Sequence, residues 1–257
     1  MTKKYDIIWA DKVDSTNEEA RRRMKDFDNL SVLSAKEQTA GRGQRGNRWS
    51  STAGENLTFS IILKFGAGLP SAIQLPAVPA SRQAAISEAA ALAVREFLYQ
   101  KGIYAMIKWP NDIYVEDKKI CGILIEHSLK GHFLDWSIVG IGLNVNQTQF
   151  PASLPNPTSM LAETGLEYDL PSCLEEFCEI FVSCIHLYLD SNDGYDKLRS
   201  MYLPFMWRKD EAYDYLDNVT GICFRGIIRG VSDIGLLMVE NEEGEIREYG
   251  FKEISYL

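Results

Sequence analysis

Apolar runs separated by turn residues predict short strands in the first part of the chain. Three such runs, at residues 5–10, 31–36 and 56–65, have the length of strands. The third, NLTFSIILKF, is apolar at successive positions, which predicts burial on both of its faces. Between the first two runs, Ser15 and Thr16 are each followed three residues later by a glutamate. This capping-box pattern predicts a helix that starts near Asn17.

Further helices are predicted where alanine is abundant or apolar residues recur with helical spacing, at 80–100, 158–164, 171–190 and 194–202. Turn residues separate apolar runs between the first two of these helices. This predicts antiparallel strands, among them 103–108 and 119–128. The pattern changes near residue 210, because six glycines then interrupt short β-type runs up to residue 257. We therefore predict an α+β protein with a larger domain at 1–209 and a small β-barrel of about five strands at 210–257.

Residues 38–50, QTAGRGQRGNRWS, combine three glycines with three arginines and lack apolar periodicity. They predict a mobile loop whose glycines let backbone N–H groups approach a ligand and whose guanidinium groups suit phosphate or carboxylate. Taken alone, the loop is also consistent with a solvated basic turn or with a segment that contacts nucleic acid. The net charge of −9 and the pI of about 5.0 argue against duplex DNA and favour a small anionic ligand.

The remaining composition narrows the cellular context. No run of about 18 apolar residues is present, so no membrane span is expected, and the N-terminus lacks the features of a signal peptide. The five cysteines include no CxxC pair, which favours reduced thiols and a cytoplasmic location. The three histidines do not have the spacing of metal ligands.

Five polar segments are expected to converge, and together they carry a resemblance. The motifs DSTN, GRGxxGxxW, KWPND, KKxxG and GxGxNxN resemble, in order and spacing, those of the bacterial biotin protein ligases, over nearly the whole chain. The resemblance implies a class II synthetase-like catalytic domain, with a mixed β-sheet and helices, followed by an SH3-like barrel. It also implies the reaction: ATP adenylates biotin, and biotin then passes to a lysine of a biotin carboxyl carrier protein.

The resemblance implies roles for individual residues. The biotin-binding set is Ser15, Thr16, Asn17, Gln38, Arg42, Gly43, Gln44, Lys119 and Gly122, in which Gly122 leaves room for the biotin ring. The set for ATP and the adenylate is Arg42, Trp49, Asn111, Lys119 and Asn144. The catalytic set is Arg42, Lys119 and Asp112. Asp112 is expected to hold Mg²⁺ or to orient Lys119, and the other metal ligands stay unassigned.

The chemistry favours the same reaction. A carboxylate that attacks an α-phosphate needs two anions brought together, and Arg42 and Lys119 can neutralise both. Two departures stand out: many relatives have arginine where this chain has Gln44, and only 14 residues precede Ser15. The loop is therefore less positive here, and a DNA-binding repressor function is not expected.

Three alternatives stay open at this point. A lipoate or octanoate ligase shares the scaffold, although the KWPND and GRGQRG segments favour biotin. A nucleic-acid-binding module is disfavoured by the acidic charge and by the lack of a second basic face. A non-catalytic biotin sensor is disfavoured by the intact Arg42 and Lys119. The expected partner is the carrier protein, with no DNA and no membrane, and the oligomeric state, a homodimer included, is left open.

Overall fold

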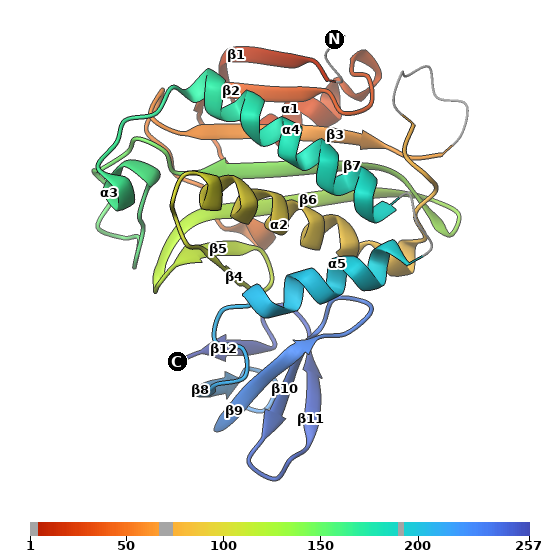
Figure 1. The fold of residues 1–257 in the computed structure, drawn as a ribbon, viewed down its shortest axis with the longest axis vertical. Coiled ribbons are helices and arrows are strands. Elements are labelled where there is room, and N and C mark those ends of the chain that lie inside the picture. Colours follow the sequence, from red (N-terminus) through yellow and green to blue (C-terminus); the bar gives the residue numbers. More distant parts are fainter. Residues whose placement is uncertain (1–4, 67–73, 190–192) are drawn as a thin grey trace.

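The computed structural model describes residues 5–66, 74–189 and 193–257. A seven-stranded sheet forms the larger part of the molecule, in the order β1-β2-β3-β7-β6-β5-β4 (Figure 1). Its strands are β1 Ile7–Val13, β2 Val32–Gln38, β3 Leu57–Lys64, β4 Met106–Lys108, β5 Asp112–Val115, β6 Lys118–Lys130 and β7 Phe133–Leu143. The β1–β2 pair is parallel and the other neighbouring pairs are antiparallel, so the predicted mixed sheet is confirmed.

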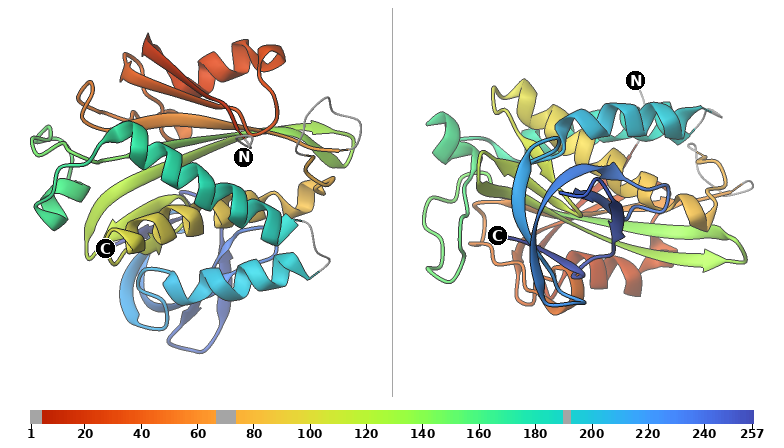
Figure 2. Two further views of the ribbon diagram at one scale, coloured as in Figure 1. Left: turned by 45° about the horizontal axis from the view of Figure 1, so that its top comes forward. Right: turned by 90° about the horizontal axis from the view of Figure 1, so that it is seen from below.

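Helices lie on both faces of this sheet. Figure 2 shows α1 on the opposite side from α2, α4 and α5. The α-helices are α1 Thr16–Arg22, α2 Ala84–Gln100, α3 Met160–Thr164, α4 Leu170–Leu189 and α5 Gly194–Tyr202. The 3₁₀ turns are η1 Met24–Asp26, η2 Gln44–Gly46, η3 Ala80–Arg82 and η4 Leu203–Phe205. The helix predicted at 171–190 is thus confirmed as α4, and its last position lies outside the described residues.

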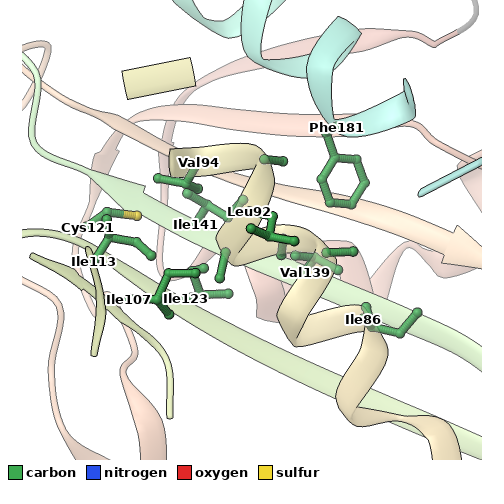
Figure 3. Packing of buried hydrophobic residues seen from close by; sticks show 14 of the residues in the cluster. Ile86, Leu92, Val94, Ile107, Ile113, Cys121, Ile123, Val139, Ile141 and Phe181 are labelled. Atoms are coloured by element: carbon green, nitrogen blue, oxygen red, sulfur yellow. The ribbon is translucent and has the colours of Figure 1, made fainter. Parts of the chain in front are cut away.

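The main core lies between α2 and the sheet. Ile86 and Val94 of α2 point toward the apolar side chains of β6 and β7, including Ile123 and Ile141 (Figure 3). Several alanines of α2 are fully buried, because small side chains let this helix approach the sheet closely. The predicted burial of the third strand is also confirmed, since every residue of β3 except Lys64 is buried.

The boundaries of some elements differ from the predicted ones. The helix predicted at 80–100 begins as a 3₁₀ turn and becomes α-helical only at Ala84. The strand predicted at 103–108 starts at Met106. At the other end of α2, Gly102 has a φ of +77° and its N–H donates to the Tyr99 carbonyl, which is the expected helix termination.

A second sheet of five antiparallel strands follows, in the order β11-β10-β9-β8-β12. Its strands are β8 Ala212–Asp217, β9 Ile222–Val231, β10 Leu237–Asn241, β11 Ile246–Tyr249 and β12 Ile254–Tyr256. It is the small C-terminal β-domain expected from the glycine pattern. The exact division at residue 210 stays a prediction, because the two sheets are tied together: Trp109 Nε1 donates to the Gly235 carbonyl at 2.9 Å, and Tyr256 Oη donates to the Trp109 carbonyl at 3.2 Å.

None of the described helices combines the length and the apolar character that crossing a bilayer requires.

Phe177 of α4 tests the packing of the core. Its ring centroid lies 5.3 Å from that of Phe59 and 6.1 Å from that of Phe97, and the side chain is 1 % exposed. Phe177→Ala should lower the free energy of unfolding by about 3–5 kcal/mol, because it opens a cavity among these rings. Urea denaturation measures the change. Leu166→Ala, at a position 62 % exposed, is the control and should change stability little. A comparable loss in both variants would contradict this packing.

Candidate functional site

One cavity of about 670 Å³ brings the predicted site residues together. It lies at the start of α1, beneath the glycine–arginine loop, and extends to the C-terminal sheet. The predicted residues that line it are Ser15, Thr16, Asn17, Gln38, Arg42, Gly43, Gln44, Trp49, Asn111, Asp112, Lys119 and Gly122. Asn144 is the one predicted residue that does not line it. Segments that are far apart in the sequence therefore line one cavity, as predicted.

Three neighbouring glycines of β6 and β7 form part of the cavity floor. Gly122 pairs with Gly142 across the two strands, and Gly140 lies two residues before Gly142 on the same face. A Cβ on Gly142 would lie 2.3 Å from Trp49 Cε2, and a Cβ on Gly122 would lie 2.9 Å from Trp49 Cζ3. The Trp49 indole therefore rests directly on the backbone of both strands. Here the room left by Gly122 is filled by this indole, and its role toward a biotin ring stays a prediction.

Lys119 and Asp112 form an ion pair inside the cavity. The Lys119 Nζ lies 2.6 Å from Asp112 Oδ1 and 5.6 Å from the centroid of the Trp49 ring. The two side chains come from neighbouring strands, β6 and β5, in which Asp112 pairs with Gly122 and Lys119 pairs with Tyr114. The arrangement favours the interpretation in which Asp112 orients Lys119. No group of three or more histidine, cysteine or carboxylate side chains that could hold a metal occurs in the described ranges.

The helix predicted to start near Asn17 is confirmed as α1, but its first turn is capped from β2 and not by the side chains of a capping box. Ser15 has the extended backbone of an N-cap, but its side chain makes no capping hydrogen bond. The Thr16 N–H instead donates to Gln38 Oε1 at 2.8 Å, and the Ser15 N–H donates to Asp14 Oδ1 at 2.7 Å. Glu18, which the pattern assigned to the cap, faces Arg42. The Ser15 and Thr16 side chains are thus left for other contacts.

The glycine–arginine loop folds back on itself. The Trp49 N–H donates to the Gly41 carbonyl at 3.0 Å, and the Gly43 N–H donates to the Asn47 carbonyl at 2.8 Å. A Cβ on Gly41 would lie 2.5 Å from the Trp49 carbonyl oxygen, so this turn needs glycine there. The predicted mobility of this loop stays a prediction.

The Arg42 guanidinium is held by carboxylates of the protein. It forms an ion pair with Glu18 of α1 and a second, at 3.3 Å, with Glu126 of β6. The Arg42 side chain is 40 % exposed at the edge of the cavity. A ligand anion would therefore compete with these two carboxylates for Arg42.

Two asparagines of the predicted set have internal partners. Asn144 Nδ2 donates to the Thr158 carbonyl at 2.8 Å, and the buried side chain lies away from the cavity. The Asn111 Nδ2 donates to the Ile123 carbonyl at 2.7 Å, although Asn111 does line the cavity. The geometry of Asn144 supports a structural role in anchoring the segment after β7.

Sequence reasoning missed the contribution of the C-terminal sheet. Residues of β12 and of the neighbouring turns complete one wall of the cavity: Asn218, Phe251, Lys252, Ile254, Ser255 and Tyr256. No motif marks these residues, and strand periodicity alone does not show which way this sheet faces. Lys108 and Trp109, the first two residues of the KWPND motif, contact this part of the chain, but the motif itself does not indicate that contact.

Lys108 is enclosed by aromatic rings at this boundary. Its Nζ lies 4.4, 4.5 and 4.8 Å from the ring centroids of Tyr114, Trp207 and Tyr256. Burial lowers the pKa of the Lys108 ammonium, and the nearby Asp112 opposes that change. The cation–π contacts tie the C-terminal sheet to the floor of the cavity.

The charged groups that line the cavity are mostly cations. Among the described lining residues there is no histidine and no cysteine. Cys121 is fully buried beside the cavity, and burial raises the pKa of its thiol. Burial also lowers the pKa of His127 to about 4, and its Nδ1 lies 2.7 Å from Ser137 Oγ, away from Lys119. The arrangement suits binding and neutralising anions.

Comparison with known proteins places the chain in a family. A sequence profile described as the biotin/lipoate A/B protein ligase family matches residues 9–144. A biotin–[acetyl-CoA-carboxylase] ligase of Paracoccus denitrificans is 31 % identical over 241 residues, which cover 91 % of this chain and 93 % of that protein. The chain belongs to the biotin/lipoate A/B protein ligase family.

Other relatives agree on the kind of ligase. The bifunctional ligase/repressor BirA of Escherichia coli is 26 % identical over 250 residues, which cover 95 % of this chain and 71 % of that protein. A solved structure of the biotin protein ligase from Aquifex aeolicus in complex with biotin and ATP has a TM-score of 0.76 and 27 % identity, and the match covers 97 % of each chain. Within the family, the chain is thus similar to biotin protein ligases.

Proposed function

We propose that this chain is an ATP-dependent biotin protein ligase. It adenylates biotin to biotinyl-5′-AMP and transfers biotin to a specific lysine of a biotin carboxyl carrier protein. The observation that carries the proposal is the single cavity that joins the Lys119–Asp112 pair, the Arg42 loop and the polar start of α1. The similarity to ligases named for biotin favours this function over the alternative, a lipoate or octanoate ligase.

The first half-reaction needs charge neutralisation. A carboxylate oxygen of biotin attacks the α-phosphorus of ATP, the bond to the β-phosphate breaks, and pyrophosphate leaves. Lys119 lies on the cavity floor, where it can approach both the carboxylate and the α-phosphate. Asp112 holds its ammonium in place at 2.6 Å until the substrates bind. Arg42 supplies a second cation once it exchanges its protein carboxylates for the ligand.

The second half-reaction uses a nucleophile from the partner. The ε-amine of the carrier lysine attacks the acyl carbon of the adenylate, AMP leaves, and the nitrogen loses a proton to form the amide. The protein then has to orient the mixed anhydride and exclude water. This division of labour agrees with a cavity lined both by Ser15, Thr16 and Gln38 and by Trp49 and Asn111.

The substrate sites follow the same division. Biotin is assigned to Ser15, Thr16, Asn17, Gln38, Gly43, Gln44 and Gly122, together with Arg42 and Lys119. The adenylate is assigned to Trp49 and Asn111, whereas Asn144 supports this site from behind. Mg²⁺ would accompany the ATP phosphates, and Asp112 is the carboxylate that lines the described cavity, which fits an ion held largely by phosphate and water.

The partner of the proposed enzyme is a carrier domain of a biotin-dependent carboxylase. The absence of a role on DNA, the cytoplasmic location and a homodimer as one oligomeric state stay predictions.

The test of the function is direct: the protein is incubated with MgATP, a carboxylase carrier domain and either labelled biotin or labelled lipoate. Label from biotin on the carrier supports the proposal. Label from lipoate alone would establish the alternative.

Lys119→Ala should be a catalytic lesion. Removing a donor that stabilises developing charge typically lowers the rate about 10²–10³-fold. The fold should persist, because the Lys119 side chain is 31 % exposed and packs in no apolar core. Pyrophosphate release measures the first half-reaction, and thermal unfolding checks the fold. Adenylate formation at the wild-type rate would refute the role.

Trp49→Ala should weaken ATP binding more than biotin binding. The indole lies over Gly142 and Gly122 on the cavity floor, and its Nε1 is buried without a hydrogen-bond partner among the described residues. Such a ring can cover a base, and the free N–H can reach a ligand oxygen. Calorimetric titration with each ligand decides the matter. Equal losses for both ligands, with a lower melting temperature, would assign Trp49 to packing alone.

A further inference from the structure

Glu126 lies behind the cavity and contacts two parts of the site at once. It is a residue of β6 whose side chain is 16 % exposed. Its Oε2 accepts a hydrogen bond from Asn17 Nδ2 at 3.0 Å. Its Oε1 faces the guanidinium groups of Arg21 and Arg42. One carboxylate thus joins the start of α1 to the arginine of the loop.

A chain of short polar contacts leads from Glu126 to the cavity. Asn17 Oδ1 accepts from Ser60 Oγ at 2.6 Å, and Ser60 Oγ lies 2.8 Å from Thr16 Oγ1. Thr16 lines the cavity, whereas Ser60 is fully buried beneath it. A Cβ on Gly140 would lie 2.2 Å from Asn17 Oδ1, so the amide is tightly seated. The contacts therefore have little freedom to rearrange.

The number of hydrogens that each group can donate fixes the direction of these hydrogen bonds. A carboxylate between two arginines has no hydrogen to give, so Asn17 turns its NH₂ group toward Glu126 and its oxygen toward Ser60. A serine hydroxyl has one hydrogen, and Ser60 uses it on Asn17. The Thr16 hydroxyl then donates to Ser60 or to Gln38 Oε1 at 3.3 Å, and its lone pairs are left for the cavity.

We propose that Glu126 is a positioning residue that, together with the Leu124 carbonyl, holds this hydrogen-bond direction and leaves Thr16 as an acceptor for substrate N–H groups. The inference rests on the proposed function, because the ureido ring of biotin supplies such N–H groups. Glu126 also anchors Arg42 beside the same contacts. One side chain therefore contacts both the Asn17 amide at the start of α1 and the loop arginine, which Glu18 also holds.

The substitution Glu126→Gln tests the direction of the hydrogen bonds between Glu126 and Thr16. The new amide has one oxygen and one NH₂ group, and two positive arginines attract the oxygen more strongly than Asn17 does. The NH₂ group then faces Asn17 Nδ2, which places two donors against each other. Relief requires Asn17 to turn over, and that breaks its contacts with Ser60 and with the Leu124 carbonyl at 3.3 Å.

Two further variants serve as controls. Glu126→Ala removes the carboxylate, but Asn17 Nδ2 can still donate to the Leu124 carbonyl. The Asn17 amide therefore keeps its orientation, and the hydrogen bonds keep their direction. Glu18→Gln changes the other carboxylate that holds Arg42, and the hydrogen-bond partners of the Asn17 amide in the described residues are Leu124, Glu126 and Ser60, not Glu18. A role of Glu126 in charge alone predicts that alanine is at least as harmful as glutamine. The proposal predicts the opposite order.

The measured quantities are the KM for biotin, the KM for ATP and the melting temperature. Glu126→Gln should raise the KM for biotin about 10- to 100-fold, the effect of a mismatched buried donor, with a much smaller change in the KM for ATP. Glu126→Ala should raise the KM for biotin less, and Glu18→Gln should leave it near the wild-type value. A Ser60→Ala background already lacks the hydrogen bonds of the Ser60 hydroxyl. In that background, Glu126→Gln should raise the KM for biotin little further.

The outcomes separate this inference from the proposed function. Failure of the wild-type protein to bind biotin or to adenylate it overturns the function, and the inference falls with it. Wild-type activity combined with equal effects of glutamine and alanine at position 126 overturns the inference alone. The inference also fails if Glu126→Gln and Ser60→Ala have additive effects on the KM for biotin, or if both KM values rise in parallel with a fall in melting temperature.

Discussion

The site depends on a strip of bare backbone in the middle of the large sheet. Gly122, Gly140 and Gly142 are neighbouring positions on the cavity face of β6 and β7, and none of them carries a side chain. The Trp49 indole and the Asn17 amide occupy the space that side chains would otherwise fill. On the opposite face, the same strands keep apolar side chains that pack on α2 (Figure 3). The sheet is therefore held rigidly from behind while its front surface accepts groups from elsewhere in the chain.

The cations of the site are held in place by the protein before any ligand is present. Lys119 pairs with Asp112, Arg42 pairs with Glu18 and Glu126, and Lys108 lies among three aromatic rings. These partners offset the cost of gathering like charges in one cavity. The net charge of −9 is thus compatible with binding an anionic acyl-adenylate, because the positive charge is local. In the proposed reaction, substrate anions replace the protein carboxylates.

Much of the fold and most of the site follow from the sequence. The buried β3, the alanine-rich α2 and the motif segments are visible as local patterns, because apolar spacing and turn residues act over a few positions. The remainder depends on long-range contacts. The cap on α1 comes from Gln38, 22 residues away, and Asn144 binds the Thr158 carbonyl instead of facing the cavity. The wall formed by the C-terminal sheet depends on how two sheets pack, which no local pattern encodes.

The central claim is that the glycine strip seats Asn17 and Trp49, and two alanine substitutions test it most directly. Calorimetric titration would measure the binding of biotin and of a non-hydrolysable ATP analogue to Gly140→Ala and Gly142→Ala, after each variant is shown to unfold cooperatively. The account predicts that Gly140→Ala loses mainly biotin, because its Cβ displaces Asn17, and that Gly142→Ala loses mainly the nucleotide, because its Cβ displaces Trp49. Wild-type affinity for both ligands in both variants would contradict it.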